Sequence, residues 1–302
     1  MGKQKQVTIL GAGPAGIAAA IYLKRTGLTP IILEKQRPGG LLRHAFLVEN
    51  YPGFPHGISG TKLADLFVLH LHKLGLSVTK SDVKCVEHKN DAFTVRAEKG
   101  EFVSSAIIIA SGTTPKKIQI PGTASLEGKR IFYEPRAIPS RTKKRILVIG
   151  GGDIAFDYTL TLLEKGNDVT ILSRSEPVCL PLLKKRVQQQ GANLQINCVA
   201  EKIHLHRKSL LLHCRQHDRI IELPADYLLI ACGREPNLSF LSPNLTKHTT
   251  ENKTFPQMSL AGLYFAGDVV RGTCRQTGIA VGDGIYAAMM VQRYIKEKEE
   301  AS

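Results

Sequence analysis

Residues 7–16 read VTILGAGPAG, a short apolar run that ends in a glycine-rich turn. Three glycines follow the spacing G-x-G-x-x-G: Gly11 allows a tight turn, Gly13 lets a pyrophosphate approach the backbone, and Gly16 lets the next helix pack closely on the strand. The first N–H groups of that helix and its partial positive charge favour a phosphate. A second apolar run ends in Glu34, where a carboxylate can accept a hydrogen bond from a ribose hydroxyl. This pattern predicts a dinucleotide-binding unit.

The same pattern recurs in the middle of the chain. The apolar run 145–149 is followed by GGGDIA at 150–155, by a helical stretch, and by a second apolar run at 169–172. That run ends in Ser173-Arg174-Ser175 instead of an acidic residue, and an arginine with flanking hydroxyls suits a 2′-phosphate. We therefore expect two nucleotide sites, of which the second prefers NADPH to NADH.

The segments around these two patterns predict the domain organisation. Residues 262–269 read GLYFAGDV, a strand that ends in Gly-Asp, and a last helix follows from about residue 278 to 296. This strand and helix are best explained as the completion of the first domain. We therefore expect an α/β protein of two Rossmann-like three-layer domains, the second inserted into the first. The expected boundaries give residues 1–114 and 245–302 to the first domain and 115–244 to the second, with hinges near 112–115 and 242–245.

Composition restricts the partners and the compartment. The chain has 302 residues and a net charge of +15, and residues 115–245 hold 20 Lys and Arg against 12 Asp and Glu. Such an excess favours an acidic partner protein, whereas no nucleic-acid motif is present and aromatic residues are sparse. No apolar run is long enough to span a bilayer, and the polar N-terminus predicts no signal peptide. The six cysteines are scattered, which predicts a reduced, cytoplasmic protein without a metal site.

From residue 7 to about residue 295, the chain resembles the low-molecular-weight thioredoxin reductase family of FAD/NADPH flavoproteins. The motifs that carry the resemblance are Gly11–Gly16, Glu34, Gly39-Gly40-Leu41, Glu49–Gly53, Ala110-Ser111-Gly112, Gly150–Ala155, Arg174, Gly267-Asp268 and Arg275-Gln276.

The resemblance implies FAD in the first domain, NADPH in the second, and a homodimer. Hydride would pass from the nicotinamide to flavin N5, with Glu34 at the adenosine ribose, Asp268 at the ribityl chain, and Asn50 beside the isoalloxazine. The implied FAD-binding residues are Gly11, Gly13, Pro14, Ala15, Gly16, Glu34, Lys35, Gly40, Leu41, Asn50, Val83, Ala110, Ser111, Gly112, Gly267, Asp268, Arg275, Gln276 and Thr277. The implied NADPH-binding residues are Gly150, Gly152, Asp153, Ile154, Ser173, Arg174 and Gly233.

The sequence departs from the family at the redox centre. Thioredoxin reductases carry a Cys-x-x-Cys before the second glycine-rich loop, and here that place reads Glu134-Pro135-Arg136-Ala137. Disulfide exchange needs a sulfur nucleophile and a second sulfur to resolve the mixed disulfide, so we do not expect a dithiol thioredoxin reductase. The run Ser173-Arg174-Ser175 also lacks the second arginine of the family's NADPH signature.

Three functions remain open at this stage. The first is a reductase that passes electrons to an acidic redox or iron–sulfur protein, such as a ferredoxin, a flavodoxin or an enzyme of cofactor or lipoate assembly. The second is a small-disulfide reductase that uses Cys274 alone. The third is a redox sensor that binds FAD and nucleotide without turnover. Candidate catalytic residues are Cys274, Glu134 and His44, which follows the Gly39-Gly40 loop.

Overall fold

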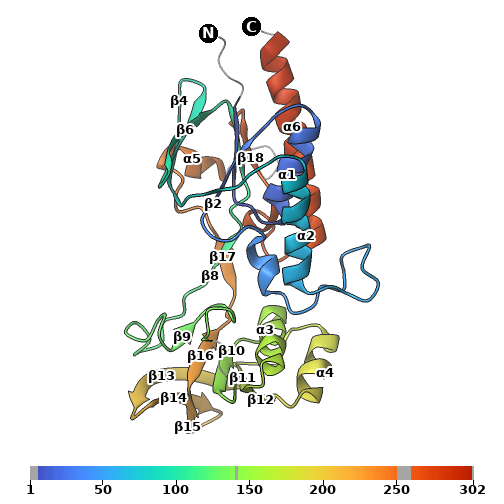
Figure 1. Cartoon of the computed structure of the whole chain (residues 1–302). Coiled ribbons are helices and arrows are strands. Elements are labelled where there is room, and N and C mark those ends of the chain that lie inside the picture. Colours follow the sequence, from blue (N-terminus) through green and yellow to red (C-terminus); the bar gives the residue numbers. More distant parts are fainter. Residues whose placement is uncertain (1–5, 140–141, 250–259, 301–302) are drawn as a thin grey trace. The chain divides into compact units, whose positions relative to one another are not determined.

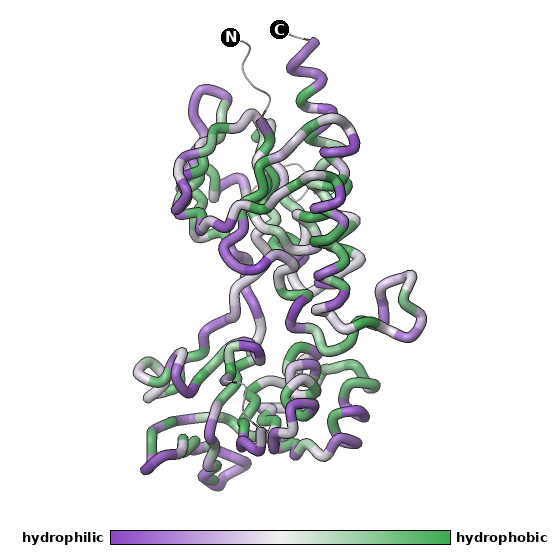
Figure 2. Tube along the Cα trace, viewed as in Figure 1, coloured by the Kyte–Doolittle hydropathy of each residue, from purple (hydrophilic) through white to green (hydrophobic). Residues whose placement is uncertain are grey.

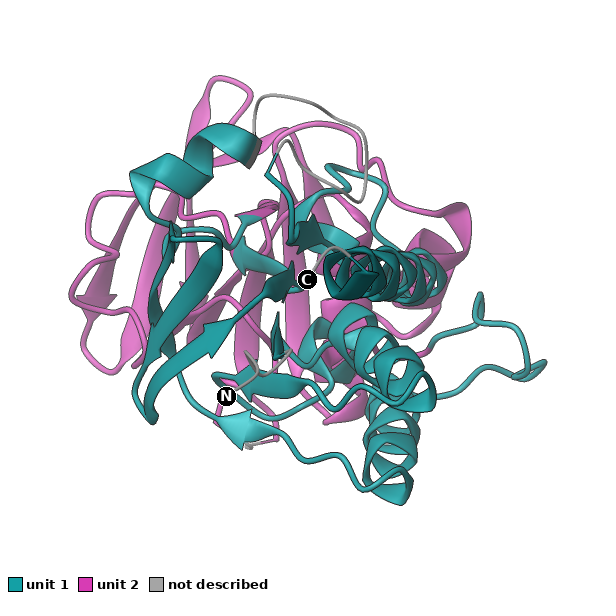
Figure 3. Cartoon of the chain, turned by 90° about the horizontal axis from the view of Figure 1, so that it is seen from above, with its two compact units in different colours: residues 1–43, 48–114, 236–302 teal, residues 44–47, 115–235 magenta. Residues whose placement is uncertain are grey.

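The computed structural model describes residues 6–139, 142–249 and 260–300. The chain forms two compact units, coloured separately in Figure 3. Unit 1 comprises residues 1–43, 48–114 and 236–302, and unit 2 comprises residues 44–47 and 115–235. Residues 1–5, on which the expectation of no signal peptide rests, lie outside the described part of the chain.

Unit 1 is built on a parallel sheet of five strands in the order β18-β7-β1-β2-β3. The first strand pairs with β2 on one side and with β7 on the other, so the strand order reverses between β1 and β7. Ligands of such sheets bind beyond the carboxyl ends of the strands at this point of reversal. The strands are β1 (Val7–Leu10), β2 (Ile31–Glu34), β3 (Thr79–Lys80), β7 (Ala106–Ile109) and β18 (Leu263–Phe265).

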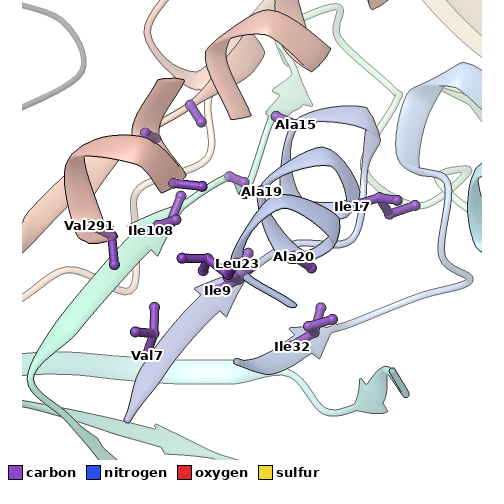
Figure 4. Packing of buried hydrophobic residues seen from close by; sticks show 14 of the residues in the cluster. Val7, Ile9, Ala15, Ile17, Ala19, Ala20, Leu23, Ile32, Ile108 and Val291 are labelled. Atoms are coloured by element: carbon purple, nitrogen blue, oxygen red, sulfur yellow. The ribbon is translucent and has the colours of Figure 1, made fainter. Parts of the chain in front are cut away.

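Helices cover one face of this sheet, as Figure 1 shows. Their small and branched side chains interlock with those of β1 and β7; Figure 4 shows Ile9 of β1 against Leu23 of the first helix, with Ile108 and Val291 beside them. Gly284 allows the first and last helices to approach closely, because a Cβ at this position would lie 2.0 Å from the carbonyl oxygen of Ala15. The helices are α1 (Pro14–Arg25), α2 (Gly60–Lys73) and α6 (Thr277–Glu300).

An antiparallel sheet covers the other face of the parallel sheet. Its strands are joined by tight turns and contribute Val86, Phe93 and Val95 to a second apolar cluster under β7. The short helix α5 (Pro243–Thr246) packs against β4 and adds Leu245 to the same cluster. The antiparallel strands are β4 (Val83–Lys89), β5 (Ala92–Ala97) and β6 (Gly100–Ser104).

Unit 2 repeats this three-layer design. Its parallel sheet has the order β12-β11-β10-β16-β9, so the reversal falls between β10 and β16. Helices α3 (Asp153–Glu164) and α4 (Pro181–Gln189) pack on one side and a three-stranded antiparallel sheet on the other. The strands are β9 (Ile131–Phe132), β10 (Arg145–Ile149), β11 (Asp168–Ser173), β12 (Asn193–Ile196), β13 (Cys198–His206), β14 (Ser209–Gln216), β15 (Arg219–Ala225) and β16 (Tyr227–Ile230).

The predicted two-domain α/β architecture is confirmed, but the boundaries differ from those expected. The chain crosses between the units at 114/115 and 235/236, next to the paired strands β8 (Thr113–Pro115) and β17 (Arg234–Pro236). Residues 236–244, expected in the second domain, belong to unit 1 because the Val86 N–H donates to the Phe240 carbonyl at 2.8 Å. The hinge expected at 242–245 is therefore part of α5 and its cap.

A second difference is a short excursion early in the chain. Residues 44–47 were expected in the first domain, yet they group with unit 2. The Phe46 N–H donates to both carboxylate oxygens of Asp157 on α3, at 2.9 and 3.2 Å, and the Phe46 ring packs on the apolar cluster of unit 2.

Within the described residues, no helix is both long and apolar enough to cross a membrane. The hydropathy trace in Figure 2 is hydrophobic along the central strands and hydrophilic at many turns.

Candidate functional site

The glycine-rich turn after β1 has the geometry that the sequence predicts. Gly11 has φ +103°, and a Cβ there would lie 2.3 Å from the Ala110 carbonyl oxygen at the end of β7. Gly16 faces the Gly11 carbonyl oxygen so closely that a Cβ would lie 1.9 Å from it. Gly13 caps α1 without a side-chain hydrogen bond, and the nearest atom to a Cβ there is 4.0 Å away. The N–H groups of Ala15 and Gly16 in the first turn of α1 and the open space at Gly13 therefore fit a pyrophosphate.

Glu34 lies at the end of β2, beside this turn. One carboxylate oxygen accepts the Ala12 N–H and the other accepts the Gln36 N–H, both at 2.8 Å. These two bonds fix the carboxylate and leave further lone pairs on each oxygen for a diol donor. Lys35, the next residue, instead pairs with Asp82 at 3.3 Å. Val83, predicted to contact the cofactor, is the first residue of β4.

The segment after β7 is hydrogen-bonded to Asn237, the residue that follows β17. The Ser111 hydroxyl donates to the Asn237 carbonyl at 2.7 Å, and the Asn237 N–H donates to the Gly112 carbonyl at 3.0 Å. Gly112 has φ +63°, which a glycine adopts without strain. Ala110 and Ser111 border the Gly11 turn, because the Cβ position of Gly11 lies 2.3 Å from the Ala110 carbonyl oxygen and 3.2 Å from the Ser111 Cα.

The Gly39-Gly40 loop packs on the first glycine turn. The Gly39 N–H donates to the Ala12 carbonyl at 2.7 Å, and a Cβ on Gly40 would lie 3.1 Å from the Cα of Gly13. Leu41 follows in a short 3-10 helix over residues 40–44. The structure thus brings Gly40 and Leu41 next to the predicted pyrophosphate position.

Two predicted residues far apart in the sequence contact each other in unit 1. The Asn50 amide donates to the side-chain oxygen of Gln276 at 2.8 Å. Gln276 and Arg275 immediately precede α6, which begins at Thr277. Cys274 is exposed, and its N–H donates to the Arg271 carbonyl at 2.9 Å.

The Gly267-Asp268 turn is held by a buried acid that the sequence reasoning missed. Asp283 on α6 is 3% exposed and accepts the Gly267 N–H at 3.2 Å. Its carboxylate also accepts the Arg271 Nε–H at 2.8 Å and a second bond from the Arg271 guanidinium. The only available sequence signal was an acid between two glycines on an otherwise apolar helix face.

Unit 2 contains a second glycine-rich turn of the same geometry, where the sequence predicts a nucleotide. Gly150 has φ +153°, and a Cβ there would lie 2.5 Å from the Ala231 carbonyl oxygen, which repeats the close approach of Gly11 to β7. Gly152 caps α3 with no atom within 4 Å of its Cβ position, which leaves room for a pyrophosphate. Asp153 begins α3 and accepts the Leu180 N–H at 2.7 Å, whereas the next side chain, Ile154, is 37% exposed.

The residues expected at a 2′-phosphate differ in exposure. Ser173 is 3% exposed and its hydroxyl donates to the Ser175 carbonyl at 2.7 Å, so this hydroxyl is committed to its own loop. Arg174 is exposed. Its cation also acts on Cys232, next to Gly233 at the end of β16: burial raises the pKa of the Cys232 thiol, and Arg174 opposes that rise. Arg174 therefore lies near the carboxyl ends of the central strands.

The comparisons with known proteins agree with this geometry. The family model described as pyridine nucleotide-disulphide oxidoreductase matches residues 5–284. The chain belongs to this family. It is 31% identical over 304 residues to the thioredoxin reductase of Bacillus subtilis, covering 97% of this chain and 96% of that protein. It is 30% identical over 311 residues to a 34.2 kDa protein in the rubredoxin operon of Clostridium pasteurianum, covering 98% and 99%.

A solved structure extends the likeness to three dimensions. The thioredoxin reductase of Lactococcus lactis in its FR conformation matches with a TM-score of 0.89 and 28% identity, covering 97% of this chain and 100% of that one. The thioredoxin reductase-like branch of the pyridine nucleotide-disulphide oxidoreductases uses FAD and NADPH. This chain is accordingly an NAD(P)H-dependent flavoprotein oxidoreductase, and the resemblance stated from its motifs is confirmed.

In this oxidoreductase, an ion-pair cluster surrounds Glu134, which lies in the segment where the sequence predicts the loss of the family's dithiol. The Glu134 carboxylate lies 3.2 Å from His44 Nε2 and 3.7 Å from the Arg234 guanidinium, all within unit 2. The hydrogen bond from His44, its charge and that of Arg234 lower the pKa of Glu134. His44, a candidate catalytic residue from the sequence, groups with unit 2, where it contacts Glu134 and the Tyr158 ring.

The six cysteines of the oxidoreductase differ in burial and contacts. Cys198 and Cys214 are buried on neighbouring strands, and a hydrogen bond from the Cys214 thiol lowers the pKa of Cys198. This contact could not be predicted from the sequence, because the two residues meet only across the β13–β14 hairpin. All six cysteines are free thiols, and Cys274 is the exposed one among them.

Proposed function

We propose that this flavoprotein takes electrons from NADPH and delivers them to an external acceptor protein, an acidic redox or iron–sulfur protein, without an internal dithiol. The observation that carries the proposal is the ion-pair cluster of Glu134 with His44 and Arg234, at the position where the sequence predicts that a carboxylate replaces the family's dithiol. A carboxylate cannot exchange with a disulfide. Both glycine cradles are nevertheless intact, so electrons can enter but must leave by another route.

The residues of unit 1 would hold FAD at the carboxyl ends of the strands of the parallel sheet. Gly13 and the first turn of α1 would bind the pyrophosphate, since the Cβ position of Gly13 is open and a helix N-terminus favours a phosphate, while Gly11 would shape the turn. Glu34, fixed by two backbone N–H groups, would accept the ribose hydroxyls. Asp268 would bind the ribityl chain. Once bound, FAD supplies the hydride acceptor for NADPH.

The same cradle would be completed by the neighbouring segments. Asn50 and Gln276, joined by a hydrogen bond, would lie beside the isoalloxazine together with the start of α6. A helix N-terminus favours the negative charge of reduced flavin. The other proposed contacts are Pro14, Ala15, Gly16, Lys35, Gly40, Leu41, Val83, Ala110, Ser111, Gly112, Gly267, Arg275 and Thr277.

Unit 2 would hold NADPH. Gly150, Gly152 and the start of α3 would bind its pyrophosphate, and Arg174 would pair with the 2′-phosphate. Asp153, Ile154 and Gly233 would border the rest of the nucleotide. Ser173 would support this site indirectly, because its hydroxyl donates to the Ser175 carbonyl and so holds the loop that carries Arg174.

The chain's charge supports an acidic acceptor. The net charge of +15 would attract a ferredoxin-, flavodoxin- or rubredoxin-like protein and speed its encounter. One relative is encoded in a rubredoxin operon. We also expect a cytoplasmic homodimer, which light scattering on the purified protein would test.

The test is a two-part stopped-flow experiment. The FAD-loaded protein is first reduced with NADPH or NADH, and its reoxidation is then followed with a ferredoxin, a flavodoxin, a rubredoxin and a small disulfide. We expect fast reduction by NADPH and reoxidation by an acidic protein that Cys274→Ser leaves unchanged. Reoxidation by the disulfide alone, lost in Cys274→Ser, would reject the proposal.

That second outcome would support a single-cysteine disulfide reductase. The exposure of Cys274, in the turn before Arg275, is the observation in its favour. Failure of both nucleotides to reduce the flavin would instead support a redox sensor. The three functions are therefore separated by one set of traces.

A further inference from the structure

Asp283 is a buried acid in a helix that otherwise packs through small and apolar side chains. Its side chain is 4% exposed, and it lies between Gly282 and Gly284, where α6 crosses α1. A buried carboxylate is costly unless it is paired and hydrogen-bonded. The Asp283 carboxylate therefore needs hydrogen-bond donors and a cation within the folded unit.

The partners of Asp283 are two turns that precede α6. It accepts the N–H of Gly267, the residue before Asp268, and it binds the guanidinium of Arg271 through two nitrogens. Gly267 has φ +79°, and a Cβ there would lie 2.9 Å from the Ala15 Cβ, so this residue is enclosed by α1 as well.

Arg271 extends the connection toward the start of α6. Its carbonyl accepts the Cys274 N–H at 2.9 Å, in the turn that leads to Arg275 and Gln276. The Arg271 side chain is 34% exposed, whereas the Asp283 side chain is almost fully buried. One carboxylate thus joins the turn of Asp268 to the turn that ends at Gln276.

We propose that Asp283 and Arg271 are positioning residues for the flavin and that their two charges set its midpoint potential. The inference rests on the FAD-binding part of the proposed function. Asp283 holds the Gly267-Asp268 turn in place for the ribityl chain, and Arg271 cancels the negative charge that Asp283 brings.

The paired charges give the inference a distinctive signature. Reduced flavin carries additional negative charge, which a nearby cation stabilises and a nearby anion destabilises. Asp283→Asn leaves the Arg271 cation without its carboxylate, so the potential should rise. Arg271→Gln leaves the Asp283 charge, so the potential should fall. A residue that acted only on folding would not shift the potential in opposite directions.

The experiment measures three quantities on the full-length protein: the FAD dissociation constant, the midpoint potential and the unfolding of the apoprotein. We expect Asp283→Asn and Arg271→Gln each to weaken FAD binding by about tenfold, the order typical of residues that hold a direct ligand in place. Arg271→Lys should restore the potential, since it keeps the charge. If Asp283→Asn does not fold, the two substitutions at the half-buried Arg271 still decide the question.

Val291→Ala is the matched control. Val291 is fully buried on the same helix but outside the Asp283 contacts, so its truncation should destabilise the apoprotein and leave the FAD dissociation constant and the potential unchanged. Potentials that shift in the same direction, or FAD binding that is unchanged in Asp283→Asn and Arg271→Gln, would overturn the inference. A wild-type protein that binds FAD but is not reduced by NADPH would contradict the proposed function and leave this inference standing.

Discussion

Asp157 shows how a single half-buried acid attaches a distant segment to unit 2. Its carboxylate accepts the N–H of Phe46 with both oxygens. Burial raises the pKa of Asp157 to about 6, with the nearby Asp153 charge acting in the same direction and the backbone hydrogen bonds opposing it. The protonated form is therefore favoured in the folded protein relative to the unfolded chain.

The stability of unit 2 should depend on this proton. Because the folded-state pKa lies above the ordinary value of 3.8, Asp157 favours folding at lower pH, and that contribution is lost as the pH rises to about 6. Relative to Asp157→Asn, the wild type should lose up to about 3 kcal/mol of unfolding free energy between pH 4 and 7. Urea unfolding at several pH values measures this difference.

Glu164→Gln provides the comparison for Asp157. Glu164 lies on the same helix but is exposed, so its replacement should leave the pH profile of the wild type unchanged. A profile of Asp157→Asn that runs parallel to the wild type would show that the Asp157 proton is not linked to folding.

Arg174 should decide the choice between the two nucleotides. We expect Arg174→Ala to raise the dissociation constant for NADPH by about tenfold and to leave that for NADH nearly unchanged, because only NADPH carries the 2′-phosphate. Fluorescence titration of the oxidised protein measures both constants. Lys185→Ala, on the neighbouring helix α4, is the control for a general loss of positive charge; an equal effect of the two substitutions would remove the specific role of Arg174.

At the scale of elements, the crossing of α1 and α6 depends on glycine. Gly284 lies against the Ala15 carbonyl, whereas Gly282, two residues earlier, is exposed and has no atom within 4 Å of its Cβ position. Gly284→Ala should destabilise unit 1 by about 1–3 kcal/mol through overpacking. Gly282→Ala should stabilise it by roughly 0.5–1 kcal/mol, because alanine is the better helix former.

Thermal unfolding of the two glycine variants checks this pair. Their expected effects have opposite signs although the chemical change and the helix are the same. Destabilisation by both substitutions would mean that helix propensity and packing are not separable here.

The elements themselves could be predicted because their signals are local. Apolar runs ending in glycine located β1, β10 and their helices. The excursion of 44–47 and the crossing at 235/236 could not be predicted, because they rest on contacts such as Val86 with Phe240 that leave no mark on either segment alone. The pairing of Asp283 with Arg271 was missed for the same reason.

At the scale of the whole molecule, the excess of positive charge should govern electron output. The bimolecular rate of reoxidation by an acidic acceptor protein should fall by about an order of magnitude between ~50 mM and ~300 mM salt, because screening weakens the attraction. Reoxidation by an uncharged quinone serves as the control and should be insensitive to salt. Stopped-flow traces over a salt series measure both, and equal slopes would argue against electrostatic docking.

The interleaved connectivity of the two units also fixes the order in which they can be completed during synthesis. Unit 2 has all of its residues once position 235 has emerged from the ribosome, whereas unit 1 still lacks β18 and α6. Until β18 and α6 have been synthesised, the edge of β7 that pairs with Leu263–Phe265 is open, and Gly267 and Asp283 are absent from the FAD site. The domain that begins first therefore finishes last, and a released chain truncated after residue 240 should show a protease-resistant unit 2 beside a digestible unit 1.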